Sequence, residues 1–215
     1  MCGGYTIAKS VEKLTKRFHA QLLEPGFSPR YNARPSQQLP IILNTDPQHI
    51  VMAHWGIKPI WAIKQGLSKE IINTQSASYN KPTFKKGFES RRCLILADGF
   101  YEWMKTSSGK QPYRFVLKDD EPFAFAGIYE ENRETGKPCF SIITTEPNEV
   151  VQPIHDRMPA MLLPSSEAVW LNPDTDLEAS LALLKPYPEN LLMTYPVSKK
   201  VNFAGNEGDF LVRTV

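Results

Sequence analysis

Runs of strand-forming residues that follow one another across short turns most restrict the fold of this chain. The runs Pro40–Leu43 and His49–Ile57 flank a DPQ turn, and Tyr113–Leu117 and Phe123–Tyr129 flank a KDDEP turn. Strands joined in hairpins form antiparallel sheets, whereas strands that alternate with helices form doubly wound sheets. We therefore expect an α+β fold with mainly antiparallel β-sheets, a barrel- or sandwich-like core and short flanking helices. Each of these two pairs of runs is expected to pair across its turn.

Further elements are expected on both sides of these hairpins. Strand patterns predict one long strand over Arg92–Trp103 and shorter strands over Cys139–Thr145 and Leu192–Val197. Ser10 suits an N-cap and precedes an apolar stripe, so we expect a helix over residues 10–23. Shorter helices are expected over residues 148–154, 165–171, the latter capped by Ser165, and 177–184. No repeat or linker divides the chain, which predicts a single domain over residues 1–215.

Composition narrows the function classes. The chain of 215 residues is 41% hydrophobic and 22% charged, enough to bury a core, and its net charge of +2 restricts any polyanion site to a local patch. No stretch reaches the roughly 20 apolar residues of a membrane span, so we expect no membrane contact and a cytoplasmic, nucleoid-associated protein. Three cysteines without metal-site spacing predict reduced thiols and neither a metal nor a cofactor, with Cys93 and Cys139 in the core.

Cys2 directly follows the initiator methionine, which is usually removed before a small side chain. Removal would leave an amine with a pKa of about 8 beside a thiol with a pKa of about 8.5, so both would have reactive fractions near neutral pH. Such a 1,2-aminothiol forms an imine with an aldehyde and then closes to a thiazolidine. Cys2 is therefore a candidate nucleophile, and the alternative is an incidental residue at a frayed end.

Four other segments carry candidate chemistry. Alternation in ADGFYEWMK puts Glu102 on an apolar strand face, where desolvation raises the pKa of a carboxyl group and suits it to acid/base work. An exposed, solvated glutamate is the alternative. His155 lies with Asp156 and Arg157 at an element boundary, although a lone histidine is often structural. Asn73 in IINTQSAS offers a donor and an acceptor. The tail PVSKKVNFAGNEGDFL is either a polyanion site or a solvated loop.

Taken in order, the segments CGGY, RYNARPS, WGIKPIW, INT, ADGFYEW, PIHDRMPAML and PVSKKVN resemble the SRAP family, the SOS response-associated peptidase-like proteins. The likeness runs from Cys2 to about Phe210. It implies an SRAP-like fold and a protein that binds single-stranded DNA at abasic sites and captures the ring-opened sugar aldehyde covalently. It also implies lyase-like imine chemistry, with Cys2 as nucleophile, Asn73 as positioning residue, Glu102 as acid/base and His155 acting on the sugar.

The chain departs from the family where DNA contacts are expected. Gly4 stands where arginine is common, and Gln75 stands where the family commonly has a second arginine after its asparagine. We therefore expect Arg157 to carry much of the phosphate binding. Other candidate DNA contacts are the basic residues Arg34, Lys85, Lys86, Arg91, Arg92, Lys199 and Lys200 and the aromatic residues Trp55, Trp61 and Phe84. Packing in the core is the alternative for at least two of these three aromatic residues.

Two other functions stay open. One is an N-terminal-nucleophile peptidase, in which Cys2, Glu102 and His155 cut Met1 from this chain or act on another chain. The other is a non-covalent single-stranded DNA-binding module in which Cys2 is incidental. The expected partner is single-stranded DNA that contains abasic sites, replication and repair proteins are further candidates, and we expect a monomer.

Overall fold

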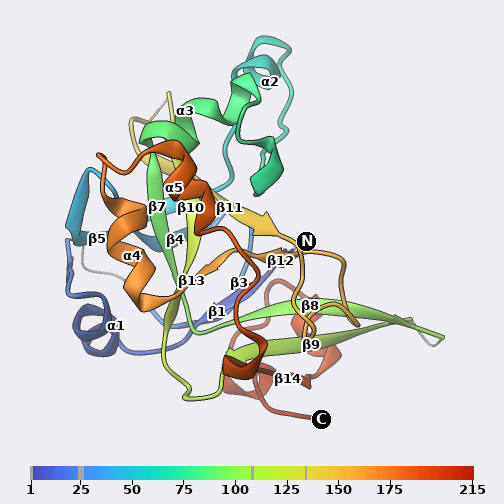
Figure 1. Ribbon diagram of the computed structural model, residues 1–215. Coiled ribbons are helices and arrows are strands. Elements are labelled where there is room, and N and C mark those ends of the chain that lie inside the picture. Colours follow the sequence, from blue (N-terminus) through green and yellow to red (C-terminus); the bar gives the residue numbers. More distant parts are fainter. Residues whose placement is uncertain (1, 24–26, 108, 134) are drawn as a thin grey trace.

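The computed structural model describes residues 2–23, 27–107, 109–133 and 135–215. These residues form two sheets with short helices around them (Figure 1). The smaller sheet contains, in spatial order, β14 (Leu192–Pro196), β9 (Gly109–Leu117), β8 (Gly99–Thr106), β1 (Tyr5–Ile7) and β3 (Arg30–Ala33). All four strand pairs in this sheet are antiparallel.

The larger sheet is barrel-like because its path returns on itself. Its order is β12 (Met158–Pro159), β11 (Pro138–Thr145), β10 (Phe123–Glu131), β7 (Arg92–Ala97), β4 (Gln38–Leu43), β5 (Asp46–Trp55) and β2 (Gln21–Leu22). A parallel pairing of β11 with β5 closes the ring, while β13 (Met161–Leu162) joins β10 and β6 (Asn73–Gln75) joins β11. The predicted α+β class with mainly antiparallel sheets is confirmed.

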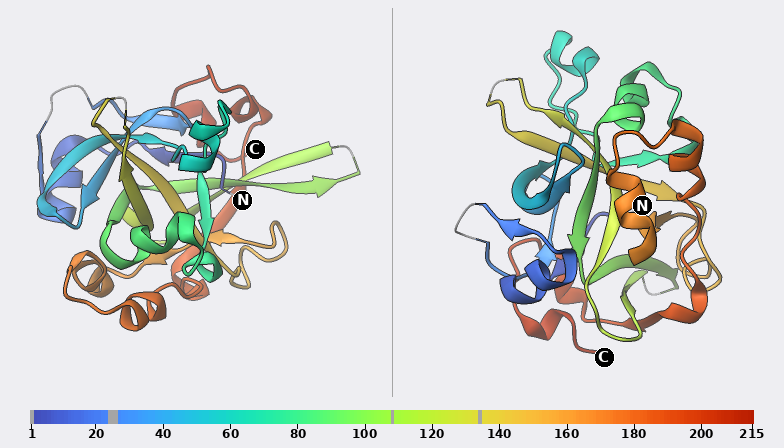
Figure 2. Two further views of the ribbon diagram at one scale, coloured as in Figure 1. Left: turned by 90° about the horizontal axis from the view of Figure 1, so that it is seen from above. Right: turned by 60° about the vertical axis from the view of Figure 1, so that its left-hand side comes forward.

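The helices are short and lie around these sheets. They are α1 (Val11–Phe18), α2 (Ile60–Lys64), α3 (Pro82–Ser90), α4 (Pro164–Leu171) and α5 (Leu177–Ala182), with 3-10 turns η1 (Ser76–Ser78), η2 (Glu189–Leu191), η3 (Lys199–Asn202) and η4 (Asp209–Leu211). Within the described residues, no helix is long and apolar enough to span a membrane. The α2 segment and the β8–β9 hairpin project from the body of the molecule (Figure 2).

The predicted long strand over Arg92–Trp103 is wrong, because Asp98 divides it into β7 and β8, which belong to different sheets. The Asp98 carboxylate is 2% exposed and accepts hydrogen bonds from the hydroxyl of Thr6, from the backbone N–H of Ala8 and Lys9, and from Arg114. A buried carboxylate needs such partners, and here they come from distant segments of the chain. The break therefore follows from tertiary contacts that a local pattern does not contain.

One of the two expected hairpins is also wrong. β4 and β5 pair as predicted, but the turn between them is Asn44–Thr45, and the DPQ residues begin β5. The runs on either side of KDDEP do not pair with each other, because β9 lies between β8 and β14 while β10 lies between β7 and β11. The KDDEP segment therefore links the two sheets.

The predicted helices differ from the structure in their extent. Ser10 caps α1 through the backbone N–H of Lys13, but the helix ends at Phe18, where His19 takes a left-handed conformation, and Leu22 lies in β2. Residues 148–154 form turns and no regular helix, and Pro153 lacks the N–H that a continuing helix needs. The helix predicted to be capped by Ser165 begins at Pro164, and its N-cap residue is Leu163. Proline is favoured at the first position of a helix. The strands Cys139–Thr145 and Leu192–Val197 and the helix over residues 177–184 are confirmed to within a few residues.

Candidate functional site

The first residues of the chain are held in the smaller sheet, where β1 lies between β8 and β3. Tyr5 of β1 lies opposite Phe100 of β8, and the Tyr101 N–H donates to the Gly4 carbonyl at 3.0 Å. The Asp98 carboxylate described above binds the other end of β1. Because β1 is fixed at both ends against β8, the segment that precedes it is brought to the position of Glu102 in β8.

Cys2 lies in the core and not at a frayed end. Its side chain is 0% exposed, and its Sγ lies 3.5 Å from the Gly4 carbonyl oxygen, to which the thiol donates. Burial, followed by the negative charge of Glu102, raises the pKa of the Cys2 thiol to about 12. The thiol is therefore protonated at neutral pH in this environment. The structure also buries Cys93 and Cys139 as free thiols, which confirms the predicted core positions.

Asn73 fixes the backbone at Cys2. It lies in β6, which pairs with β11 in parallel and sets Asn73 opposite Ile142. Its Nδ2 donates to the carbonyl oxygen of Cys2 at 2.8 Å. The Oδ1 atom of Asn73 is buried and accepts no hydrogen bond from any residue that the structure describes. A buried acceptor of this kind is available to a donor on a bound molecule.

Glu102 occupies the face of β8 that alternation predicts. Tyr101 and Trp103 lie on the opposite face, with ring centroids 6.5 Å apart, in a small apolar cluster with Val197 and Val201. Glu102 is 1% exposed, and burial raises the pKa of its carboxyl group to about 7, with Asp156 adding to the rise. Near neutral pH this carboxyl group both accepts and donates protons, as general acid/base catalysis requires.

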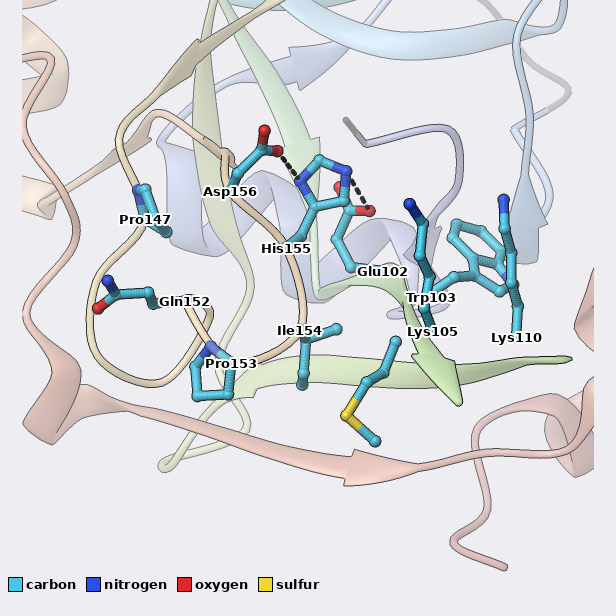
Figure 3. A pocket seen from close by; sticks show the side chains of 11 residues that line it. Glu102, Trp103, Lys105, Lys110, Pro147, Gln152, Pro153, Ile154, His155 and Asp156 are labelled. Carbon is cyan, nitrogen blue, oxygen red and sulfur yellow. Dashed lines mark ion pairs between the residues drawn. The ribbon is translucent and has the colours of Figure 1, made fainter. Parts of the chain in front are cut away.

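His155 completes a group of titratable side chains with Glu102 and Asp156 (Figure 3). Its Nε2 lies 3.8 Å from a carboxylate oxygen of Glu102, and its Nδ1 lies 2.8 Å from Asp156 Oδ1. The backbone N–H of Arg157 also points at Nδ1, at 3.1 Å. The Arg157 N–H is a donor, so it binds Nδ1 when this nitrogen carries no proton. The Asp156 carboxylate is an acceptor, so it binds Nδ1 when this nitrogen is protonated. Burial lowers the pKa of His155, which favours the neutral ring.

Glu102 and His155 line an open pocket of about 820 Å³. Its other walls come from the β8–β9 hairpin and from the turn before His155, namely Trp103, Met104, Lys105, Lys110, Pro147, Gln152, Pro153, Ile154 and Asp156. Cys2 is fully buried and is not one of the lining residues. Glu102 therefore connects the two, since it lines the pocket and its charge acts on the Cys2 thiol.

Two of the predicted cations make internal contacts. Nη2 of Arg157 donates to the carbonyl oxygen of Thr144 at 2.5 Å and to its hydroxyl at 3.2 Å, which anchors the loop after His155 to β11. The guanidinium of Arg34 donates to the carbonyls of Gly3 and Val201 and lies 5.4 Å from the Trp103 ring. A side chain at Gly4 would begin 3.0 Å from Arg34 Nη1, so the glycine leaves room for this arginine.

Other predicted contacts lie away from the pocket. Trp55 is 0% exposed and packs between Tyr5 and Phe140, so the expectation that it stacks on a base is corrected. Arg92 is likewise 0% exposed and donates to carbonyls such as that of Trp170. Phe84 packs partly against the core. Four exposed lysines lie on α3 or η3 and none lines the pocket: Lys85, Lys86, Lys199 and Lys200.

Sequence reasoning missed Lys105 and Lys110, which do line the pocket. The sequence does contain a signal for this pair: a hairpin that brings the two ends of KTSSGK together sets Lys105 and Lys110 opposite each other. No cluster of three or more His, Cys, Asp or Glu side chains suited to a metal ion occurs among the described residues.

The fold and this site define a class of small α+β proteins in which a buried cysteine near the N-terminus lies beside a buried carboxyl group and a histidine. A family model described as SOS response associated peptidase (SRAP) matches residues 1–204, so the chain belongs to the SRAP family. The chain is 38% identical to the abasic site processing protein YoqW of Bacillus subtilis, over all of both chains. It is 30% identical to the abasic site processing protein YedK of Escherichia coli, over 86% of this chain and 85% of that protein. A crystal structure of a Bacteroides thetaiotaomicron protein matches with a TM-score of 0.88 and 25% identity over both full chains.

Proposed function

We propose that this protein captures abasic sites in single-stranded DNA by forming a thiazolidine between Cys2 and the sugar aldehyde. One observation carries the proposal: Cys2, Asn73 and the near-neutral carboxyl group of Glu102 meet at the first residues of the chain. The names of the relatives, as abasic site processing proteins, support the same substrate. The crosslink would shield the lesion during DNA repair.

The order of the steps follows from the state of the thiol. Because burial keeps the Cys2 thiol protonated, the amine that removal of Met1 frees is the first nucleophile. It adds to the C1′ aldehyde to give a carbinolamine, which loses water to form an imine. The S–H then adds across the C=N bond, with sulfur bonding to C1′ and the proton ending on nitrogen. Glu102 takes a proton from the attacking amine and returns one to the departing hydroxyl group.

His155 acts on the sugar before this addition. The closed abasic sugar must open to expose its aldehyde, and a proton on the ring oxygen assists that opening. His155 finds a hydrogen-bond partner at Nδ1 in either protonation state, and its Nε2 faces Glu102. In this proposal the pair passes a proton between the pocket and Glu102 when the 3.8 Å between Nε2 and the carboxylate oxygen shortens in the complex with DNA.

The test uses a single-stranded oligonucleotide with one abasic site and a denaturing gel. Wild-type protein, with Met1 removal verified by intact mass, is expected to give a denaturant-stable adduct. Cys2→Ala and Cys2→Ser both keep the amine and are expected to give no denaturant-stable adduct, only an imine that is lost unless it is trapped by reduction. Cys93→Ala, which removes a different buried thiol, is the matched control. A full yield of stable adduct with Cys2→Ala contradicts the mechanism, and binding without any adduct in the wild type favours a non-covalent module.

A second candidate is a peptidase that removes Met1, and the family description favours it. The same Cys2 and Glu102 would supply the nucleophile and the acid/base. Protein made without methionine aminopeptidase is then expected to trim itself over time, and Glu102→Gln to stop the trimming. Intact mass over a time course separates this activity from capture of DNA.

A further inference from the structure

We infer that Lys105 and Lys110 form a phosphate subsite at the mouth of the pocket, holding a phosphodiester group next to the abasic sugar. This inference rests on the proposed function and names how the same site holds its strand. We call Lys105 and Lys110 the lysine rim. In Figure 3 both side chains extend in the same direction from the β8–β9 hairpin.

The strand register places the two lysines directly across from each other. Lys105 of β8 pairs with Lys110 of β9, close to the end of the projecting hairpin. Directly opposite residues have Cβ atoms about 4.5–5.5 Å apart, and like charges at such positions destabilise the pair. Both side chains are exposed, and neither makes an ion pair with a carboxylate of the described residues. An anion bound between the two ammonium groups would remove this repulsion.

The pocket has an uneven charge distribution that orients an anionic strand. Asp156, whose side chain is 88% exposed, lies on one side of the Glu102–His155 pair, and the lysine rim lies on the other in the view of Figure 3. A phosphate is repelled by Asp156 and attracted to the rim. The positive charge of Lys105 acts on His155, because it contributes to the lowered pKa of that ring. Trp103 also lines the pocket and offers an aromatic surface beside the phosphate.

The rim also supplies charge that other positions lack. Gly4 and Gln75 carry no charge, Arg34 binds backbone carbonyls, and Nη2 of Arg157 is used by Thr144. Lysine suits a phosphate whose position varies, because its ammonium is a point charge with three donors on a flexible stem. The lysine rim therefore contributes binding without taking part in the chemical steps.

The experiment compares Lys105→Ala/Lys110→Ala with Lys16→Ala/Lys118→Ala, which removes two exposed charges outside the pocket. Equilibrium binding of the abasic strand is measured in a Cys2→Ala background over a range of salt concentrations. The slope of log affinity against log salt is expected to become shallower by ~0.7 for the rim variant, as for the loss of one phosphate contact, and to stay unchanged for the control.

Crosslinking with Cys2 restored gives a second measurement. For the rim variant, the DNA concentration that gives half-maximal rate is expected to rise severalfold, while the rate at saturation stays within twofold of wild type. Equal salt slopes for the two double variants would overturn the inference while leaving covalent capture intact. A fall in the saturated rate with no change in half-saturation would also overturn it. Failure of wild-type protein to form an adduct would instead refute the proposed function.

Discussion

Glu102→Gln tests the central electrostatic claim, because the buried carboxyl group makes stability depend on pH. Its pKa is about 7 in the folded protein and has a reference value of 4.5. The folded state therefore holds this proton more tightly, and stability falls as pH rises from about 4.5 to about 7. The full effect is 2.5 pKa units at 1.36 kcal/mol each, or ~3 kcal/mol. Gln has the same shape and does not ionise, so the variant lacks this dependence.

The measurement is urea unfolding of both proteins at about pH 5 and about pH 8.5. Linkage predicts that the free energy of unfolding of the variant rises by about 2.5 kcal/mol relative to that of wild type between these two pH values. This is less than the full effect, because part of the loss of wild-type stability has already occurred at about pH 5. Glu131→Gln, at the exposed end of β10, is the matched control and is expected to show a flat difference. A flat difference for Glu102→Gln as well would mean that the carboxyl group is not desolvated, and the acid/base assignment would lose its basis.

Two further substitutions test how the site is held. A methyl group at Gly99 would lie 2.8 Å from Arg114 Nε and from Thr6 Oγ1, so Gly99→Ala is expected to lower the unfolding free energy by about 1–3 kcal/mol in urea titrations. Asn73→Ala removes the donor to the Cys2 carbonyl and is expected to slow crosslinking at saturating DNA by about tenfold, with unchanged affinity in a Cys2→Ala background. An effect of Asn73→Ala on affinity alone would make it a DNA contact.

Local periodicity predicted the features of the site that depend on one strand. Alternation along ADGFYEW placed Glu102 on the face opposite Tyr101 and Trp103, and the structure has this arrangement. The same reasoning failed at Asp98, because its partners Thr6 and Arg114 are 92 and 16 residues away in sequence. The alternation of a strand depends on neighbouring residues. The interruption of a strand at a buried carboxylate depends on hydrogen-bond partners from other parts of the fold.

Assigning surface roles from sequence was the weakest step. Trp55 and Arg92 have side chains typical of DNA contacts, but both are fully buried, and composition does not reveal this. Lys85 and Lys86 are neighbours in sequence, but both lie on α3 and neither lines the pocket. Lys105 and Lys110 are neighbours in space, and only a hairpin register brings them together.

Strand β8 explains why these separate features act as one site. Asp98, directly before it, holds β1 in place, and the Tyr101 N–H donates to the Gly4 carbonyl. Glu102 supplies the buried carboxyl group, and Lys105 lies near the hairpin end. Their spacing is set by a single extended backbone at about 3.3 Å per residue. A slip of one residue in the β1–β8 register would turn Glu102 to the Tyr101 face and carry the charge away from Cys2. The buried Asp98 network opposes such a slip, so the contacts that divide β7 from β8 are also those that align Cys2 with Glu102.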